Sequence, residues 1–192
     1  MKQSLTELNK LLKEKGGIRL DIGCGASKTP GTVGIDVLPL PGVDIVHDLE
    51  DTPWPLPDNC ALSATASHIL EHINPHKGVF INVMNEVWRV LKPNGQFAFV
   101  VPYAGSHGYY QDPTHCNPIN ESTMYYFDPL HVSGFYQFYK PKPWKIEFQA
   151  MSRVGNLEVI LSKRQEDPTY LHPHQPLDIT QEVKHVETQR LS

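Results

Sequence analysis

The sequence predicts an α/β domain built on a largely parallel sheet. Short apolar runs that stop at glycine or proline alternate with a longer segment whose apolar residues recur every three to four positions, and this alternation is typical of βαβ units. With 40% hydrophobic and 20% charged residues, the chain has a globular composition. Its 192 residues are enough for one domain with a core of its own.

The expected elements follow in chain order. Leucines at helical spacing between Leu5 and Leu12 predict a short amphipathic helix that ends at residues 16–17. Valines at helical spacing over residues 79–91 predict a second helix, whereas the proline-rich residues 51–59 should be loop. Seven segments are predicted to be strands, the last two as an antiparallel hairpin: residues 18–22, 32–37, 43–47, 61–67, 96–101, 144–152 and 157–161.

Composition and charge bear on partners and compartment. The net charge of −4 disfavours a nucleic-acid partner. Residues 1–17 lack the apolar core of a signal peptide, and no run of about 18 apolar residues could span a membrane. The three cysteines show no C-x-x-C spacing, which fits a reduced compartment. We therefore expect a cytoplasmic protein without a membrane span, and predict nothing about its oligomeric state.

Polar residues follow four successive predicted strands. Two glycines in the sequence Gly23-Cys24-Gly25 allow a tight turn and a close approach of the backbone to a ligand. Asp36 ends the second strand, where a carboxylate can accept hydrogen bonds from both hydroxyls of a ribose. Asp48 follows the third strand, and Ser67-His68 the fourth. Ligands of parallel sheets bind beyond these carboxyl ends, so we expect a ligand site here.

These motifs together resemble the class I S-adenosylmethionine-dependent methyltransferases of the small type 11 kind. The matching segments are LDIGCG at 20–25, VGID at 33–36, HDLED at 47–51, SHILEHI at 67–73 and EVWRVLKPNGQFAFVVP at 86–102. The resemblance covers about residues 18–161. It implies a Rossmann-like class I methyltransferase fold, with a seven-stranded, mostly parallel sheet whose last strand is antiparallel, and S-adenosyl-L-methionine as cofactor.

The resemblance also implies cofactor-binding roles for ten residues. The glycine loop would hold the methionine moiety, Asp36 the ribose, and the residues after the third strand the edge of the adenine. Ser67 and His68 would line the pocket near the sulfonium. In chain order the ten are Asp21, Gly23, Cys24, Gly25, Asp36, Val37, Asp48, Leu49, Ser67 and His68.

The chain departs from the family pattern in its first crossover. The third glycine of the loop is replaced within Ala26-Ser27, and 36 − 25 = 11 positions separate Gly25 from Asp36. A dinucleotide-binding fold has its acid about 20 residues beyond the motif. The spacing therefore counts against a nicotinamide cofactor and predicts a first crossover helix shortened to a turn.

Candidate catalytic residues lie beyond the fifth strand, in the string Asp112-Pro113-Thr114-His115. Related small methyltransferases often carry this D-P-T-H string, and a histidine suits proton removal near neutral pH. We expect His115 to be the base or a substrate ligand, with Asp112 as its partner. The alternative, which the sequence favours equally, is that Asp112 and Pro113 form a turn and that His115 only packs against this turn. His107 is a weaker third candidate.

The string His68-Ile69-Leu70-Glu71-His72 is a literal H-x-x-E-H, a pattern of some zinc enzymes. On a helix, its two histidines could share a metal ion. No second helix supplies an evident third ligand, and we expect His72 to be exposed. A divalent metal held by Asp112 and His115 is a further alternative, without support from ligand spacing. We therefore assign no metal ligand.

The acceptor is the least determined part of the function. The string Asn/Asp/Ser-Pro-Pro-Tyr/Phe of base-methylating enzymes is absent after the fourth strand, and no Pro-Cys nucleophile is present. We expect methyl transfer to a small-molecule or sugar-like acceptor, with O-methylation favoured. Residues 103–142 would cap the acceptor site of a domain over residues 1–165, followed by a tail over 166–192. The alternative is a non-catalytic cofactor-binding or interaction protein with this fold.

Overall fold

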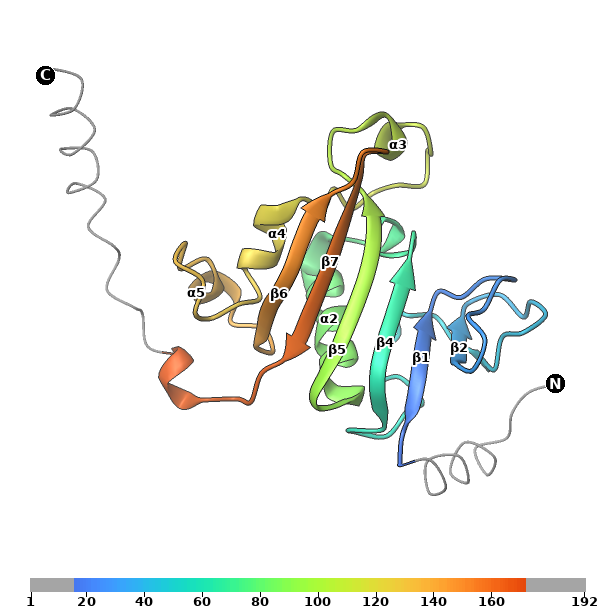
Figure 1. Cartoon of the computed structure of the whole chain (residues 1–192), viewed down its shortest axis with the longest axis horizontal. Helices are drawn as coiled ribbons and strands as arrows, with labels where there is room; N and C mark the ends of the chain where they lie inside the picture. The colour runs from blue at the N-terminus through green and yellow to red at the C-terminus, as the bar shows by residue number, and fades with distance from the viewer. Residues whose placement is uncertain (1–15, 172–192) are drawn as a thin grey trace, which may run out of the picture.

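The structure is a computed structural model, and it describes residues 16–171. The helix expected near Leu5 and most of the expected tail lie outside the described residues. A seven-stranded sheet runs through the described part of the chain in the order β3-β2-β1-β4-β5-β7-β6 (Figure 1). Its strands are β1 (Ile18–Ile22), β2 (Val33–Asp36), β3 (Ile45–Val46), β4 (Ala61–Ser67), β5 (Leu91–Pro102), β6 (Trp144–Met151) and β7 (Asn156–Lys163).

The pairing of the strands confirms the expected fold class. β3, β2, β1, β4 and β5 pair in parallel, and β7 pairs antiparallel with both β5 and β6. The last strand of the chain is thus antiparallel to its neighbours, as expected. All seven predicted strands are present.

One long helix, α2 (Val79–Val90), connects β4 to β5. It begins where the predicted helix begins, but β5 follows it directly at Leu91 instead of starting near Gln96. Leu91 pairs with Ala61, and the register shifts before Gln96 pairs with Ser63. Asn94, in the left-handed region at φ 62°, lies within this irregular stretch. The predicted stop signal therefore forms a bulge at the start of a strand.

The core lies on one face of the sheet. α2 covers this face, and the short helices α4 (Glu121–Tyr125) and α5 (Tyr136–Tyr139) lie on the same side next to β6 (Figure 1). The rings of Phe80 in α2 and Phe127 after α4 meet edge to face at 5.8 Å. Alternate strand residues such as Leu20, Phe97 and Leu161 are fully buried here. Along the strands, buried and more exposed side chains thus alternate, and this alternation defines an inner and an outer face of the sheet.

The first crossover contains turns and no helix between Gly23 and Thr32, so the predicted shortening is confirmed. The Asp21 carboxylate accepts a hydrogen bond from the Thr29 amide at 2.7 Å and holds the turn. Lys28 Nζ donates to Asp44 at 2.5 Å, which carries the lysine stem across Gly34. A side chain at Gly34 would meet this stem and Cys24 Sγ. A single lysine therefore covers part of β2, where a helix would otherwise lie.

The outer face of the sheet has no helix over it among residues 16–171 (Figure 1). Thr65, Ser67 and Glu158 are exposed on it. A pocket of about 340 Å³ lies on this face, between Asp21 and Phe148. Doubly wound parallel sheets ordinarily carry helices on both faces. The described part of this chain covers one.

Arg89 on α2 joins the helix to the proline-rich loop at 51–59. Its guanidinium donates two hydrogen bonds to Glu86, at 2.7 and 2.8 Å, and others to Asp58 and to the carbonyls of Leu56 and Trp54. Glu86 also accepts from the Trp54 amide at 2.7 Å. The Trp54 indole in turn donates to the Leu49 carbonyl at 2.9 Å. We call this set the Arg89 latch.

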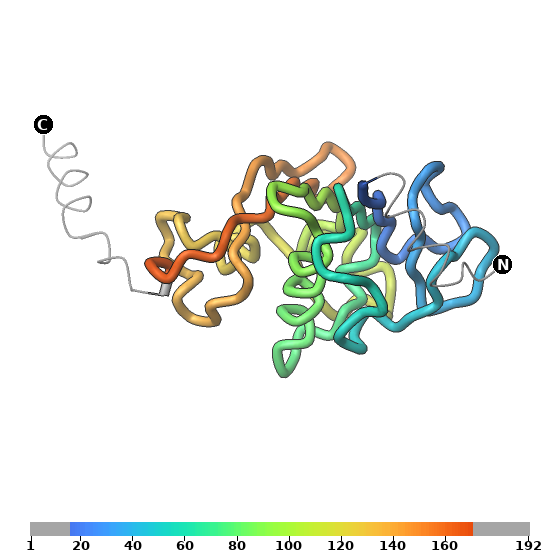
Figure 2. The backbone as a smooth tube through the Cα atoms, turned by 90° about the horizontal axis from the view of Figure 1, so that it is seen from below, coloured from blue at the N-terminus to red at the C-terminus, as the bar shows by residue number. Residues whose placement is uncertain are grey.

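The view from below shows α2 in the middle of the described part of the chain. Figure 2 shows the first strands (blue) at one end, residues 164–171 (red) at the other, and α2 (green) between them. No helix among residues 16–171 is both long enough and apolar enough to cross a membrane.

The division between a domain at 1–165 and a tail remains a prediction. At the boundary, Lys142 pairs with Glu166 at 2.5 Å.

Candidate functional site

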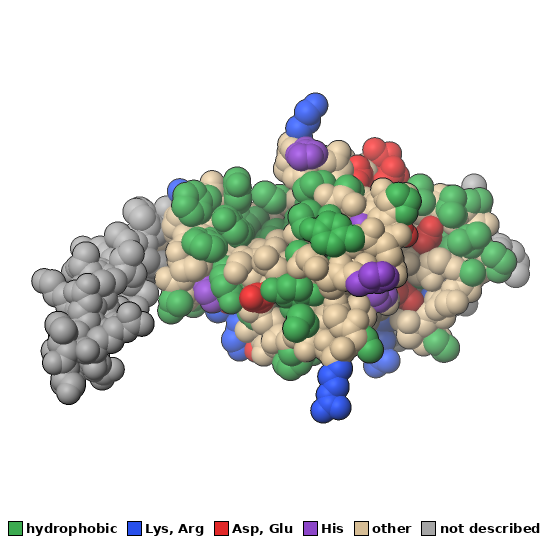
Figure 3. Space-filling model, turned by 90° about the horizontal axis from the view of Figure 1, so that it is seen from above, with side chains coloured by type: hydrophobic (Ala, Val, Ile, Leu, Met, Phe, Trp, Pro, Cys, Tyr) green, Lys and Arg blue, Asp and Glu red, His purple; other side chains and the backbone are tan. Residues whose placement is uncertain are grey.

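The carboxyl ends of β1, β2, β4 and β5 meet along one edge of the sheet, which Figure 3 shows face-on. Histidine and acidic side chains are exposed on this edge among apolar ones. The edge divides into two parts. The glycine turn and the ends of β2 and β3 form one part, and a pocket beyond β4, β5 and β7 forms the other.

The glycine turn after β1 requires glycine at its first position. Gly23 has a φ of +64°, and a Cβ there would stand 2.4 Å from the Cγ1 atom of Ile69. The amides of Gly23 and Cys24 donate to the Ile35 carbonyl at 2.8 and 3.3 Å. Gly25 also has a positive φ, of +53°, but nothing lies within 4 Å of its Cβ position. The turn therefore packs tightly on one side and is open at Gly25.

Asp36 is bound to the glycine turn. Its Oδ2 accepts from the Gly25 amide at 2.8 Å and its Oδ1 from the Leu38 amide at 2.9 Å. The residue is 9% exposed, while the neighbouring Val37 is 55% exposed. Each carboxylate oxygen keeps a further lone pair. A partly presented carboxylate beside an exposed apolar side chain can bind the hydroxyls of a ribose and one face of a base.

The residues after β3 lie next to this position. β3 pairs with β2 through Asp36 and Val46. Asp48 is exposed, and its Oδ1 accepts from the Glu50 amide at 3.0 Å. Leu49 is buried, and its carbonyl accepts from Trp54, so the Arg89 latch supports it from behind. The structure thus brings Asp36, Val37, Asp48 and Leu49 to one part of the edge.

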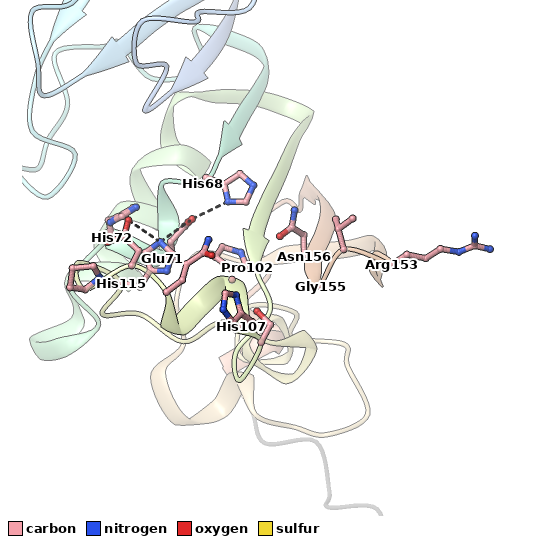
Figure 4. Close-up of a pocket in the computed structure, with 15 residues that line it drawn as sticks. His68, Glu71, His72, Pro102, His107, His115, Arg153, Gly155 and Asn156 are labelled. Atoms are coloured by element: carbon pink, nitrogen blue, oxygen red, sulfur yellow. Dashed lines mark ion pairs between the residues drawn. The ribbon is translucent and has the colours of Figure 1, made fainter.

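The second part of the edge is an open pocket of about 830 Å³ (Figure 4). It lies between the end of β4, the loop after β5 and the β6–β7 turn. Its lining residues are His68, Glu71, His72, Pro102, Ser106, His107, Gly108, Gln111, Asp112, Pro113, His115, Arg153, Val154, Gly155 and Asn156. In Figure 4, Arg153 points away from the histidines. Of these fifteen residues, Arg153 is the one lysine or arginine.

His68 begins the pocket in an uncommon backbone conformation. Its φ is 54°, in the left-handed region that few non-glycine residues adopt. Its amide donates to the Val100 carbonyl of β5 at 2.9 Å, and its side chain is 48% exposed. Such strain costs about 1–3 kcal/mol and is concentrated at functional sites. His68, predicted to lie near a sulfonium, directly follows β4 and lines the pocket.

A buried carboxylate, Glu71, lies at the base of the pocket. It is 0% exposed, and neither of its oxygens has a hydrogen-bond partner among the described residues. Its Oε1 lies 3.3 Å from Nδ1 of His68 and 3.9 Å from Nε2 of His115 (Figure 4). A buried carboxylate whose oxygens accept no hydrogen bond is costly in free energy. Two imidazoles thus approach the Glu71 carboxylate at ion-pair distance without a hydrogen bond to it.

His115 is oriented by the backbone and not by Asp112. Its Nδ1 lies 2.8 Å from the Tyr109 carbonyl, which can only accept a hydrogen bond. Nδ1 therefore carries the proton, and in the neutral ring Nε2 has a free lone pair. Nε2 lies 3.9 Å from both Asp112 Oδ2 and Glu71 Oε1. The side chain is 8% exposed, so this lone pair is sheltered.

Asp112 forms the turn that the sequence offered as the alternative to a catalytic role. Its Oδ1 accepts from the Thr114 hydroxyl at 2.6 Å and from the Thr114 amide at 2.8 Å. These hydrogen bonds hold the pKa of Asp112 below its usual value. Its other oxygen, Oδ2, faces His115. Turn formation and proximity to the histidine are thus both present.

Two short segments far apart in the sequence close the pocket. The amides of Cys116 and Asn117 both donate to the Glu71 carbonyl at 2.9 Å, and the Asn117 side chain donates to the Leu70 carbonyl at 3.0 Å. The rings of His72 and His115 meet edge to face at 4.7 Å. We call this pairing of residues 70–72 with 115–117 the loop closure.

Sequence reasoning missed Glu71 and His72. His72 was expected on the surface, but it is half-buried, and Thr114 Oγ1 lies 3.0 Å from its Nδ1. The H-x-x-E-H string was the available signal, and it lacked the third partner that residue 115 supplies. His107 lines the pocket but belongs to another wall (Figure 4).

The insertion at 103–142 is divided between two places. Its residues that line the pocket all lie between Ser106 and His115, including the short helix α3 (His107–Tyr110). Ile119, Met124 and Phe127 belong instead to the core beside α2. A cap over an acceptor remains a prediction for the first part of the insertion.

Comparisons with known proteins agree on the fold. No protein-family model matches the sequence, and no curated protein matches it either. Among solved structures, a SAM-dependent methyltransferase from Archaeoglobus fulgidus is similar at a TM-score of 0.55 and 18% identity, over 81% of this chain and 92% of that one. A 16S rRNA (adenine(1408)-N(1))-methyltransferase from Catenulisporales acidiphilia reaches 0.57 at 14% identity, over 84% and 92%.

A third similar structure is the [4+2]-cyclase SpnF, at a TM-score of 0.52 and 16% identity, over 81% of this chain and 79% of that one. At identities this low, the comparisons establish the fold. The chain has the Rossmann-like fold of class I methyltransferases.

Proposed function

We propose that the protein is an S-adenosylmethionine-dependent methyltransferase that acts on a small-molecule or sugar-like acceptor. The observation that carries the proposal is the division of one sheet edge into two neighbouring parts. One presents Asp36, Val37 and Asp48 beside the glycine turn, and the other is the histidine-lined pocket. A methyl transferase needs a nucleoside-type donor site and an acceptor pocket that meet where the methyl group moves.

The residues of the first part fit the cofactor. The space beside Gly25 is open, Val37 offers an exposed apolar surface, and Asp36 keeps lone pairs for ribose hydroxyls. In this proposal the turn around the methionine moiety is formed by Asp21, Gly23, Cys24 and Gly25. Ser67 and His68 lie toward the sulfonium. Asp48 and Leu49 address the edge of the adenine. When bound, the cofactor supplies an electrophilic methyl group.

The pocket residues then act on the acceptor. The sheltered lone pair on Nε2 of His115 can take the proton of an acceptor hydroxyl, or hold that hydroxyl in line for transfer. Asp112 Oδ2 lies 3.9 Å from the same nitrogen, so a carboxylate stands beside the ring when it has taken the proton. O-methylation is thus the transfer that these groups suit best.

The lining of the pocket also favours a compact acceptor over a nucleic acid. Nucleic-acid binding rests on phosphate contacts from several lysines and arginines. Among the residues that line this pocket, two are acidic and one is an arginine that points away from the histidines. Methylation of an RNA base, the activity named for one similar structure, is the competing acceptor class.

Calorimetric titration of the full chain with S-adenosylmethionine tests the cofactor. We expect binding, and we expect Asp36→Ala to weaken it at least about tenfold, because it removes charge-assisted hydrogen bonds to the ribose. Asp44→Ala is the matched control, since this carboxylate pairs with Lys28 instead. Absence of binding to folded protein would refute the proposal.

A survey of acceptors, measured as S-adenosylhomocysteine production, tests the activity. Small-molecule and sugar acceptors are compared with RNA in the same assay. We expect turnover with the former and its loss in His115→Ala. Cofactor binding without turnover on any acceptor would instead favour a non-catalytic binding protein, or other chemistry on this fold as in the cyclase.

A further inference from the structure

We propose that Glu71, His72 and His115 bind a divalent transition-metal ion of the Zn²⁺ class at the base of the pocket. One ligand atom from each of the three residues lies within 4.8 Å of the other two. Glu71 is fully buried, and both of its oxygens lack a hydrogen-bond partner among residues 16–171. A buried carboxylate aimed into a cluster of imidazoles is the second observation, independent of the clustering itself.

A metal ion accounts for the charge of Glu71 better than the neighbouring histidines do. The nearest nitrogens stand 3.3 and 3.9 Å away and form no hydrogen bond with it. Buried charges in proteins are paired, hydrogen-bonded or bound to metals. The two histidines pair with Glu71 only when their rings are protonated, and its oxygens accept no hydrogen bond. A metal ion held by the surrounding side chains would neutralise the charge with neutral rings.

The donor set indicates which metal. Two imidazoles and one carboxylate are the ligands of some catalytic zinc sites and of non-haem iron(II) sites, whereas Mg²⁺ and Ca²⁺ prefer oxygen. Metal–ligand bonds of about 2.0–2.2 Å in a tetrahedron place ligand atoms about 3.4 Å apart. The observed 3.9 Å between Glu71 Oε1 and His115 Nε2 requires a contraction of about half an ångström, and a pair of ligand atoms at the 4.8 Å limit of the cluster would require about 1.4 Å. Metal binding therefore needs side-chain rotations that draw the three ligands together.

The groups behind the ligands are also arranged for a metal. Metal-binding histidines donate their other ring N–H to a carbonyl or carboxylate. The Nδ1 of His115 does so to the Tyr109 carbonyl at 2.8 Å. The Nδ1 of His72 contacts the Thr114 hydroxyl, which itself donates to Asp112. The loop closure fixes Glu71 and His115 relative to each other through the Glu71 carbonyl.

Three protein ligands leave a coordination position open, as in catalytic zinc sites. All three residues line the 830 Å³ pocket, so this position faces the space assigned to the acceptor. This part of the inference rests on the proposed function. An oxygen of the acceptor would bind the ion and would release its proton to solvent in the open pocket more readily, because a bound divalent ion lowers the pKa of a ligated hydroxyl group. His115 would then act as a ligand and not as the base.

The test is Zn²⁺ binding by the full-length protein, freed of metal with a chelator and titrated in competition with a chromophoric chelator. We expect one site per chain that is lost or weakened at least about tenfold in Glu71→Gln and in His115→Ala. His76→Asn, which changes an exposed histidine outside the pocket, is the control and should retain the site. The Co²⁺-loaded protein should show visible absorption bands that Glu71→Gln lacks.

Thermal unfolding keeps the inference testable if a variant folds poorly. Zn²⁺ should raise the Tm of the wild type by mass action and leave that of Glu71→Gln unchanged. Without metal, Glu71→Gln should melt at or above the wild-type Tm, since it removes a buried carboxylate whose oxygens accept no hydrogen bond. Absence of binding, preference for Mg²⁺, or binding unaffected by both variants would overturn the inference. Cofactor binding is measured separately with Asp36→Ala, which should retain Zn²⁺, so failure of the proposed function is distinguishable.

Discussion

Replacement of Arg89 by alanine should destabilise the protein and weaken cofactor binding together. The guanidinium holds Glu86, Asp58 and two loop carbonyls, and Glu86 holds the Trp54 amide. The substitution leaves the Glu86 side chain, which is 11% exposed, with a single backbone partner. It also frees the loop whose Trp54 indole supports Leu49.

The size of the effect follows from the burial of each pair. Removing one partner of a buried ion pair costs about 3–5 kcal/mol. Because the Arg89 side chain is 23% exposed, we take the lower end, about 3 kcal/mol. The Asp58 side chain is 71% exposed, and its pair should contribute less than about 1 kcal/mol. At about 2–4 °C per kcal/mol for a chain of this size, Arg89→Ala should lower the Tm by about 6–12 °C.

The loss of stability is measured by urea and thermal unfolding of the wild type, Arg89→Ala and Asp58→Ala. Asp58→Ala is the matched control and should shift the Tm by about 1–3 °C. Calorimetric titration with S-adenosylmethionine then shows whether loss of the latch, which supports Leu49, also weakens cofactor binding. If Arg89→Ala lost no more stability than Asp58→Ala, the latch would be a surface ion pair and the reasoning would be wrong.

The latch also predicts a pH dependence. Burial raises the pKa of Glu86, but the hydrogen bonds from Arg89 and from the Trp54 amide outweigh this and leave the pKa below its usual value. A lowered pKa contributes stability that is present above the usual pKa of glutamate, about 4.3, and is lost as the pH falls through the folded value. The difference in Tm between wild type and Arg89→Ala should therefore shrink between about pH 6 and pH 3.

Two further substitutions test the site. Gly23→Ala should cost about 2–4 kcal/mol of unfolding free energy, because it adds a clash with Ile69 to the strain of a positive φ. Gly25→Ala should cost only the strain, about 1–2 kcal/mol. Equal losses of stability in urea unfolding would contradict the described packing. Thr114→Ala should raise the pKa of Asp112 toward its usual value in an NMR titration of the carboxyl carbon, because Thr114 supplies the hydrogen bonds that lower it. An unchanged midpoint would count against that contact.

Much of the sheet could be predicted from the sequence because its strands have sharp chemical boundaries. The strand at 18–22 lies between two glycines, and the predicted and observed limits agree. The strand at 61–67 agrees as well. The start of β5 was predicted too late, since Pro93-Asn94-Gly95 is equally a helix stop and a bulge inside a strand. Backbone pairing with β4 decides between them.

The candidate site was less predictable, because part of it depends on contacts between distant segments. The placement of Asp36 after β2 follows from strand order in any parallel sheet. Glu71 and His72 require His115, which is 43 positions beyond His72 and reaches them through the loop closure. Periodicity describes one segment at a time and carries no signal for such a pairing. The exposure predicted for His72 was wrong for this reason.

The loop closure has a consequence for how the pocket is assembled during folding. Its hydrogen bonds join residues about 45 positions apart, with α2 and β5 between them. The segment that carries His115 follows β5 and contains only the four-residue helix α3 before His115, so ordering it costs chain entropy that local structure offsets little. It can therefore open while the sheet stays intact, as a separate cooperative unit. Opening would carry His115 away from Glu71 and leave the glycine turn and Asp36 in place. The two parts of the edge thus differ in their stability to local unfolding. The strand ends are as stable as the sheet, whereas the pocket exists only while the loop is closed.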